Sequence, residues 1–408
     1  MSPPNRLLSL GLPALALWGA TAVSISAQQP VTRAQAVAAA LARGARAAFG
    51  RADTAAAAGT LHAARLYPNP SAAASYSKDV PHYHVAADLP LDLPWIRSAR
   101  IGAAASARDA ARYGFAFERA SIRFDMDTTY TRALAALARA RLSRRTALDA
   151  DSLRKMAQLR REVGDVSELD VHLAAVNAGQ LENVAADDSV AAVQAHLGVQ
   201  LAMGLPAEDV TITLADSLVP PPSPPPDTMP PAAGEPLRVA AAAASLRSSE
   251  RALALARRSV FAAPSLQVGF DTDDPGGQRG LLPTVGLSLP LPLFNWNGGE
   301  VRQAAAARDR AQAGLDLVRR ETGAELARVR RGFALALARL ERDRRLLSSA
   351  DRVAAMSLQA YAEGVVALPN VLEAQRNARE ALARYIDDVA AANDAAAAVR
   401  LLTATDQP

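Results

Sequence analysis

Acidic residues gather around two glycines that interrupt long helical patterns. The chain contains the segments REVGDVSELDV and AEGVVALPNV, with carboxylates in or just beyond both. Seven residues make up this candidate site: Gly164, Asp165, Glu168, Asp170, Glu363, Gly364 and Glu373. A ring of carboxylates around a pore favours cations, so these residues could form a charged constriction. Solvated charges at a helix turn are the alternative interpretation, because exposed charges contribute little to stability.

Other residues that could do chemistry are few. His82 and His84 flank Tyr83 and could bind a transition metal, but two imidazoles without a third ligand are more often incidental. The sequence has no cysteine, which excludes thiolate metal sites and disulfides. It also contains no catalytic Ser/His/Asp set, phosphate loop or dinucleotide fingerprint. We therefore expect no enzymatic activity and no cofactor.

The basic charge of the chain does not indicate nucleic acid binding. The chain has 45 lysine and arginine residues and 41 aspartate and glutamate residues. Only Lys78 and Lys155 are lysines, and the arginines are spread along helical segments. Solvated helix faces explain this distribution better than a nucleic-acid surface.

The first residues have the pattern of a signal peptide. Arg6 precedes an apolar run that ends near Trp18, and small residues lead to Ala27. This pattern predicts cleavage after residue 27 and export of the remaining chain.

The remaining sequence is an internal repeat. Leu89-Pro90-Leu91 recurs as Leu289-Pro290-Leu291, and the glycines 164 and 364 have the same offset of 200 residues. Each half has the predicted order α-β-β-α-α. The predicted domains are the signal peptide at 1–27, a first repeat at 28–218 (strands about 71–91, helical hairpin about 98–203), a proline-rich linker at 219–236, and a second repeat at 237–404 (strands about 265–291, helical hairpin about 297–402).

The helices of this repeat are unusually long. Proline is absent from 98–162 and 297–363, and at about 1.5 Å per residue each segment would span roughly 100 Å as a helix. The glycine at the end of each predicts a tight turn into a returning helix. A shorter helix, Arg33 to about Leu66 in the first half and Leu237 to about Val260 in the second, precedes each pair of strands.

Four strands are predicted, at 71–77, 82–91, 265–272 and 284–291. Several alternate apolar with small or polar residues, as strands with one apolar face do. The smallest membrane barrels need about eight strands, so one chain cannot close a barrel and several copies must cooperate. The predicted fold class is mainly helical, with transmembrane strands.

The chain resembles the TolC-like outer-membrane efflux factors. The segments that carry the resemblance are VTRAQAVAAAL, LYPNPS, DLPLDLPWIRSARI and LSLPLPLFNWNGGEVRQA, together with the two glycine tips, and the last segment is most similar to the heavy-metal efflux branch. The resemblance implies a homotrimer in the outer membrane, with a twelve-stranded barrel, most of the chain in a periplasmic coiled-coil tunnel, and both tips facing a periplasmic adaptor and an inner-membrane pump. It also implies passive conduction of metal cations, drugs or other solutes.

The alternative is a periplasmic coiled-coil adaptor or structural protein without channel activity. Such an adaptor would have one helical hairpin flanked by two lipoyl-like β halves. The sequence instead predicts two hairpins and two pairs of strands, which favours the channel.

Overall fold

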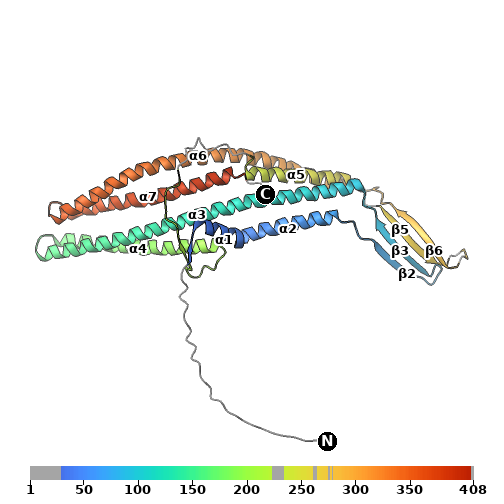
Figure 1. Ribbon diagram of the computed structural model, residues 1–408, viewed down its shortest axis with the longest axis horizontal. Coiled ribbons are helices and arrows are strands. Elements are labelled where there is room, and N and C mark those ends of the chain that lie inside the picture. The colour runs from blue at the N-terminus through green and yellow to red at the C-terminus, as the bar shows by residue number, and fades with distance from the viewer. Residues whose placement is uncertain (1–28, 223–233, 261–263, 274–275, 278, 406–408) are drawn as a thin grey trace, which may run out of the picture.

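The computed structural model describes residues 29–222, 234–260, 264–273, 276–277 and 279–405. The predicted signal peptide and most of the predicted proline-rich linker lie outside these residues. The described chain is an elongated, gently curved layer of helices with a small sheet at one end (Figure 1). This arrangement is mainly helical, as predicted.

Two long helical hairpins form the body of the molecule. Helix α3 (Pro94–Glu162) turns back into α4 (Glu168–Ala202), and α6 (Gly298–Ala362) turns back into α7 (Leu368–Thr403). Helix α3 has 69 residues and α6 has 65, so each is roughly 100 Å long. Helix α3 begins earlier than the predicted Ser98, because Pro94 lies in its first turn, where a missing N–H breaks no helical hydrogen bond.

The single helix predicted before the first strand is wrong, because Gly44 divides it. Helix α1 (Arg33–Arg43) begins with a capping box between Thr32 and Gln35, and α2 (Ala45–Arg65) follows Gly44. A Cβ at Gly44 would lie 2.4 Å from the carbonyl oxygen of Ala40, so only glycine fits this bend. The corresponding helix of the second half, α5 (Leu237–Arg258), is continuous.

The sheet at the end of the molecule has four antiparallel strands in the order β2, β3, β5, β6. Their bounds are Ser71–Tyr76 for β2, Tyr83–Pro90 for β3, Ser265–Thr272 for β5 and Leu281–Ser288 for β6. Strand β6 begins three residues before the predicted Thr284 and includes Pro283. An edge strand tolerates this proline, because one side of its backbone has no pairing partner.

A short parallel pair that the sequence did not predict lies at the middle of the molecule. Strand β1 (Gln29–Val31) pairs with β4 (Ile212–Leu214). The Tyr130 hydroxyl of α3 donates to the carbonyl of Val31 at 2.7 Å, and Val31 and Ile212 belong to the largest buried cluster, which also includes Met126 and Val199. This pair therefore anchors both ends of the first repeat to α3 and α4.

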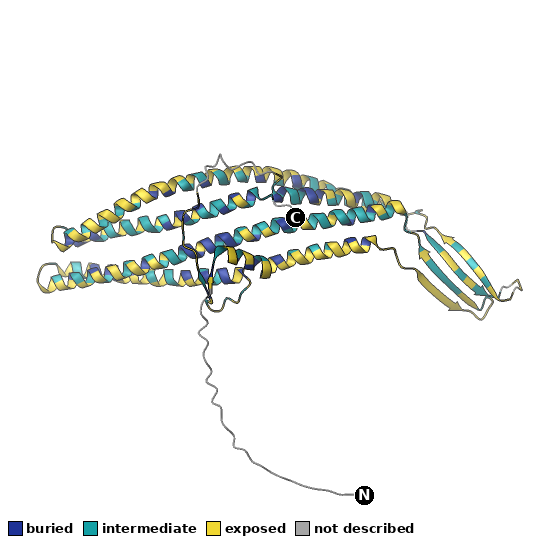
Figure 2. Ribbon diagram, in the orientation of Figure 1, coloured by how far each residue is buried: buried dark blue, intermediate teal, exposed yellow. Residues whose placement is uncertain are grey.

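The helices form one thin layer (Figure 2). Helix α3 packs against α2, α4, α5 and α7, and α6 packs against α5 and α7. Toward the tips the order across the layer is α6, α7, α3, α4, which leaves α4 and α6 at its two edges (Figure 1). Within the described ranges, no helix combines the length and the apolar character needed to cross a membrane.

Candidate functional site

The two hairpins turn with the same backbone geometry. Gly164 and Gly364 adopt left-handed conformations with φ of 79° and 78°. The amide after each glycine bonds back to the helix it leaves, Asp165 to the Arg160 carbonyl at 2.8 Å and Val365 to the Ala360 carbonyl at 2.9 Å. Glycine adopts a positive φ without the steric cost of a Cβ, so both tips end their helices in the usual way.

One side chain joins the two tips. Arg160, near the end of α3, donates from Nε and Nη2 to Oδ2 of Asp165 at 2.9 and 2.7 Å. Its Nη1 donates to the backbone carbonyl of Tyr361 on α6 at 2.6 Å, and its guanidinium lies 4.8 Å from the centroid of the Tyr361 ring. The Arg160 side chain is only 17% exposed, so solvent screens these contacts less than it screens an open surface pair.

An apolar cluster lies beneath this arginine. It contains residues from both hairpins: Leu153, Ala157, Ala174, Tyr361, Leu368 and Val371. Tyr361 is 2% exposed, and its hydroxyl is buried without a hydrogen-bond partner. Burial raises the pKa of Tyr361, and the nearby Arg160 charge opposes this change. The ring therefore acts as a neutral, apolar contact between the hairpins.

The predicted acidic residues have different environments. Asp165 is held by Arg160, and Asp170 completes the capping box of α4 by accepting from the backbone and hydroxyl of Ser167 at 3.2 and 2.8 Å. These two carboxylates thus have local structural roles. The structure brings them close enough to Tyr361 to act on its hydroxyl electrostatically.

The remaining three acids point to solvent. Glu168 lies 3.7 Å from His172, Glu363 accepts from Gln359 at 3.1 Å, and Glu373 accepts from Arg376 at 2.9 Å. Each of these partners is within four residues on the same helix. None of these contacts joins one hairpin to the other. The three carboxylates can therefore contact another molecule without disturbing the packing of the tips.

Sequence reasoning missed the two residues that join the tips. Arg160 and Tyr361 each lie three or four residues before a tip glycine, in the last turn of a long helix. An arginine in that turn can reach the loop and its helix C-terminus. The signal was present, but only the packing of the hairpins shows that Arg160 reaches Tyr361.

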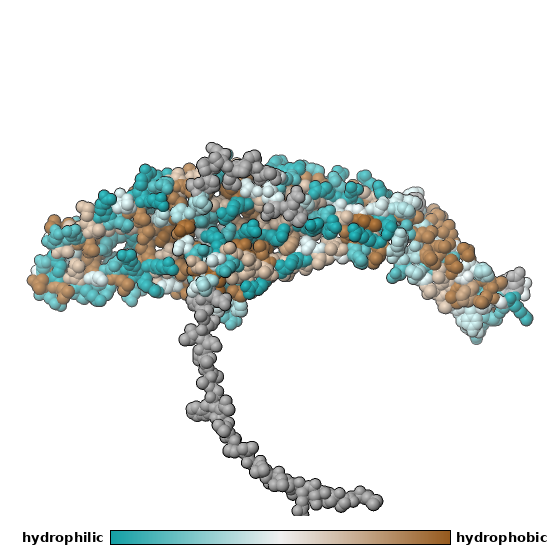
Figure 3. Space-filling model, in the orientation of Figure 1, coloured by the Kyte–Doolittle hydropathy of each residue, from teal (hydrophilic) through white to brown (hydrophobic). Residues whose placement is uncertain are grey.

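The sheet at the opposite end has two unlike faces. Register places Val85 opposite Phe270 and Ala87 opposite Val268, whereas the alternate residues His84 and Asp271 pair on the other face. The same alternation continues into β6, where Val285 and Leu287 are 76% and 68% exposed. Apolar residues therefore form an exposed face over the strands, visible at the sheet end in Figure 3.

The histidines lie near the outer end of this sheet. Nδ1 of His84 pairs with the Asp271 carboxylate, and Nδ1 of His82 lies 3.3 Å from the Ser77 carbonyl. Among the residues that the structure describes, no three histidine, aspartate or glutamate side chains are grouped as a metal site would require. The histidines thus lack a third ligand in the single chain.

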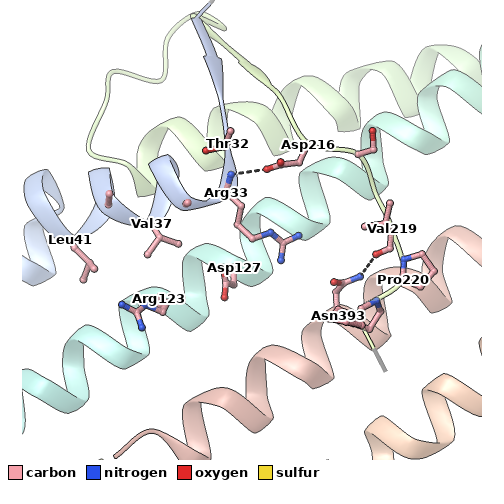
Figure 4. A pocket seen from close by; sticks show the side chains of 15 residues that line it. Thr32, Arg33, Val37, Leu41, Arg123, Asp127, Asp216, Val219, Pro220 and Asn393 are labelled. Carbon is pink, nitrogen blue, oxygen red and sulfur yellow. Dashed lines mark hydrogen bonds between the residues drawn. The ribbon is translucent and has the colours of Figure 1, made fainter. Parts of the chain in front are cut away.

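A cavity of about 820 Å³ lies at the middle of the molecule, between α1, α3 and α7 (Figure 4). Asp216 accepts from the backbone N–H of Arg33 at 2.7 Å, and Asn393 donates to the Val219 carbonyl at 2.9 Å. These bonds fix the segment after β4 against both repeats. Asp127 at the cavity wall pairs with Arg400 at 3.0 Å, which links α3 to α7.

Comparison with solved structures identifies the fold. No family model and no curated protein sequence matches the chain. It is similar to the CmeC outer membrane channel of Campylobacter jejuni, with a TM-score of 0.77, 14% identity and coverage of 98% of this chain and 94% of that one. For the outer membrane protein VceC of Vibrio cholerae the TM-score is 0.74, with 15% identity and coverage of 92% and 97%.

A third similar structure is that of CusC, a protein whose conformational changes accompany folding and transmembrane channel formation. Its TM-score is 0.73, with 14% identity and 92% coverage of both chains. The chain therefore has the fold of these outer-membrane channels along almost its whole length. The mainly helical fold expected from the resemblance to TolC-like proteins is confirmed for the single chain.

Proposed function

We propose that this chain is one subunit of a homotrimeric outer-membrane channel that conducts solutes out of the periplasm as part of a tripartite efflux system. One observation carries the proposal: the subunit has open edges along its whole length. At the sheet end β2 and β6 each have one unpaired side, and toward the tips α4 and α6 are the outer helices. A layer that is open on both sides along its length is suited to closing on copies of itself.

The sheet supports a barrel made from three copies. Each chain supplies four strands, so three chains supply twelve, above the roughly eight that the smallest membrane barrels need. The exposed apolar face that carries Val285 and Leu287 would contact lipid. The opposite face carries Asp88, Gln267 and Asp271, which suits a water-filled interior.

The helical layer supports a tunnel below that barrel. Helix α4 exposes Leu169 and Val176, and α6 exposes Leu346 and Val353, with exposures between 56% and 66%. Each pair is spaced seven residues apart, as in the seam of a coiled coil. Joining the α4 edge of one copy to the α6 edge of the next would bury both stripes.

The duplicated order of elements fits the same architecture. The proposed repeats at 28–218 and 237–404 each give two strands and one helical hairpin, so the trimer would have six nearly equivalent units. In this proposal the proline-rich segment 219–236 is the linker between the repeats, and residues 1–27 are the signal peptide that directs export and is then cleaved. The heavy-metal branch and the nature of the solute rest on the sequence resemblance.

The tips are proposed as the periplasmic entrance. Glu168, Glu363 and Glu373 are exposed there and would recur three times around the axis, where they would favour cations or meet an adaptor. Arg160 and Tyr361 would hold the entrance narrow by joining the hairpins of one subunit. As the resemblance to the efflux factors implies, an inner-membrane pump would supply the energy and this subunit would conduct passively.

The test is the mass and single-channel conductance of the mature protein, purified in detergent and added to planar bilayers. We expect a trimer that conducts as discrete channels. A water-soluble monomer that gives no conductance would refute the proposal and would favour the adaptor-like alternative.

A further inference from the structure

The second hairpin contains a section with almost no buried residues. On α6, Leu340 and Tyr361 are buried, and between them Asp343 alone is buried. On α7, no residue between Val371 and Ile386 is buried. A cavity of about 270 Å³ lies between the helices on the tip side of Asp343. Over this section α6 and α7 therefore bury few side chains against each other within one chain.

Two aspartates face each other at the upper boundary of this section. Asp343 on α6 and Asp388 on α7 are each 7% exposed. Each has an Oδ2 atom that is buried and has no hydrogen-bond partner. Burial raises the pKa of Asp343, and the nearby negative charge of Asp388 raises it further. Two ionised carboxylates in this position would repel each other, and each would leave an acceptor unsatisfied.

The surrounding charges only partly offset this repulsion. Arg339 donates to Oδ1 of Asp388 at 3.1 Å, and Arg339 and Arg342 lower the pKa of Asp343 less than burial raises it. Glu380 and Arg384 of α7 line the adjoining cavity with opposite charges.

An arginine of the neighbouring helix is already bound to a different carboxylate. Arg139 of α3 is paired with Asp387, the residue next to Asp388. Leu218 and Tyr385 pack against the buried residues just above the pair. The two buried Oδ2 atoms therefore have no basic partner among the described residues.

We propose that Asp343 and Asp388 share one proton, and that this proton holds α6 to α7 where the section with almost no buried residues begins. The shared proton gives each orphaned oxygen a partner and removes one of the two charges. When it leaves, the carboxylates repel, and the section toward the tip loosens. The second hairpin thus becomes softer as the pH rises.

The sign of the effect follows from linkage. Because the folded hairpin binds the proton more tightly than the unfolded chain does, stability is greatest below the ordinary pKa of aspartate. It falls as the pH rises from that value through the raised pKa of Asp343. The population of opened hairpin increases about tenfold for each unit by which the pKa is raised.

Hydrogen–deuterium exchange of the full mature protein tests this inference without reference to conduction. After correction for intrinsic rates, amides in 344–360 and 372–385 should exchange faster at pH 8 than at pH 5. D343N should exchange slowly at both values, because an asparagine amide donates to Asp388 as the shared proton does. D388N should also lose most of the pH dependence, because an asparagine amide at position 388 donates to the ionised Asp343 and no second carboxylate remains to repel it.

The matched control is D351N, which removes an exposed aspartate from the same helix. It should retain the pH dependence of the wild type. Equal pH dependence in D343N and D351N would overturn the proposal, as would no pH dependence in the wild type. Slowing of exchange at pH 8 by calcium in the wild type, but not in D343N, would assign the pair to a cation and overturn the shared proton.

The consequence for conduction rests on the proposed function and is measured separately. In bilayers, the wild-type channel should open more often at pH 8 than at pH 5, and D343N should open rarely at both. Exchange that depends on pH in a protein that never conducts would support the proton pair and refute the channel, so the two failures are distinguishable.

Discussion

Replacing Arg160 by alanine should separate the tips of the two hairpins. Two of its contacts cross between the hairpins: the 2.6 Å hydrogen bond to the Tyr361 carbonyl and the stacking at 4.8 Å on the Tyr361 ring. A hydrogen bond from a charged group contributes about 1.5–3 kcal/mol. A cation–π contact contributes about 0.5–1 kcal/mol where exposed and more where desolvated.

Together the two contacts should contribute about 2–4 kcal/mol to keeping the tips together, since Arg160 is mostly buried. That free energy corresponds to a change of roughly 30- to 1,000-fold in the ratio of joined to separated tips. The ion pair with Asp165 lies within the first hairpin and does not enter this sum.

The assay uses the absence of cysteine from the sequence. Cysteines introduced at Val163 and Val365, which are 79% and 74% exposed, give one spin-label site on each tip. Pulsed electron paramagnetic resonance should show one narrow distribution of distances between the two labels of a subunit of the parent protein. R160A should add a longer and broader population.

Two further variants separate the contributions. D165N removes the ion pair within the first hairpin but leaves both contacts to Tyr361, so its distance distribution should stay close to that of the parent. R160K retains the charge but not the planar fork that reaches Asp165 and Tyr361 at once, so it should resemble R160A. An unchanged distribution in R160A would refute the reasoning.

Three other perturbations have expected outcomes. V268K places a charge on the apolar sheet face and should weaken membrane insertion by about 2–4 kcal/mol. Q267K, on the opposite face of the same strand, should insert normally. Flotation with liposomes measures the insertion of both variants. G164V forces a branched side chain into a left-handed turn and should lower the free energy of unfolding by at least about 1–2 kcal/mol, measured by chemical unfolding. G179A adds a methyl group in open space on α4 and should not lower the stability of the protein. Burial lowers the pKa of His196, so the folded state disfavours the charged imidazole. The stability of the protein should therefore fall as the pH drops below about 6.5. Thermal unfolding of H196Q should no longer show this pH dependence.

The regular parts of the fold were predictable because local rules determine them. Long stretches without proline gave the helices α3 and α6, and Gly164 and Gly364 gave the turns, because a positive φ suits glycine. Alternating residues gave the strand β5 at its observed bounds. These patterns depend on neighbours within a few residues, which the sequence displays directly.

The errors occurred where a single residue or a distant partner overrides the pattern of its surroundings. Gly44 breaks a segment that is otherwise rich in helix formers, because the chain bends there and leaves no room for a Cβ. Pro283 lies inside β6 because that strand is at an edge. Strands β1 and β4 pair across about 180 residues, and no periodicity in three residues reveals such a partner.

The candidate site divides in the same way. The acids around the two glycine turns could be predicted, since composition and spacing are local properties. Only the packing of the helices shows that Arg160 reaches Tyr361 in the other hairpin and that Asp343 and Asp388 are buried beside each other. The alanine-rich helices permit several rotations about their axes with similar local energy. The packing of one helix against the next selects which of these charged side chains are buried together.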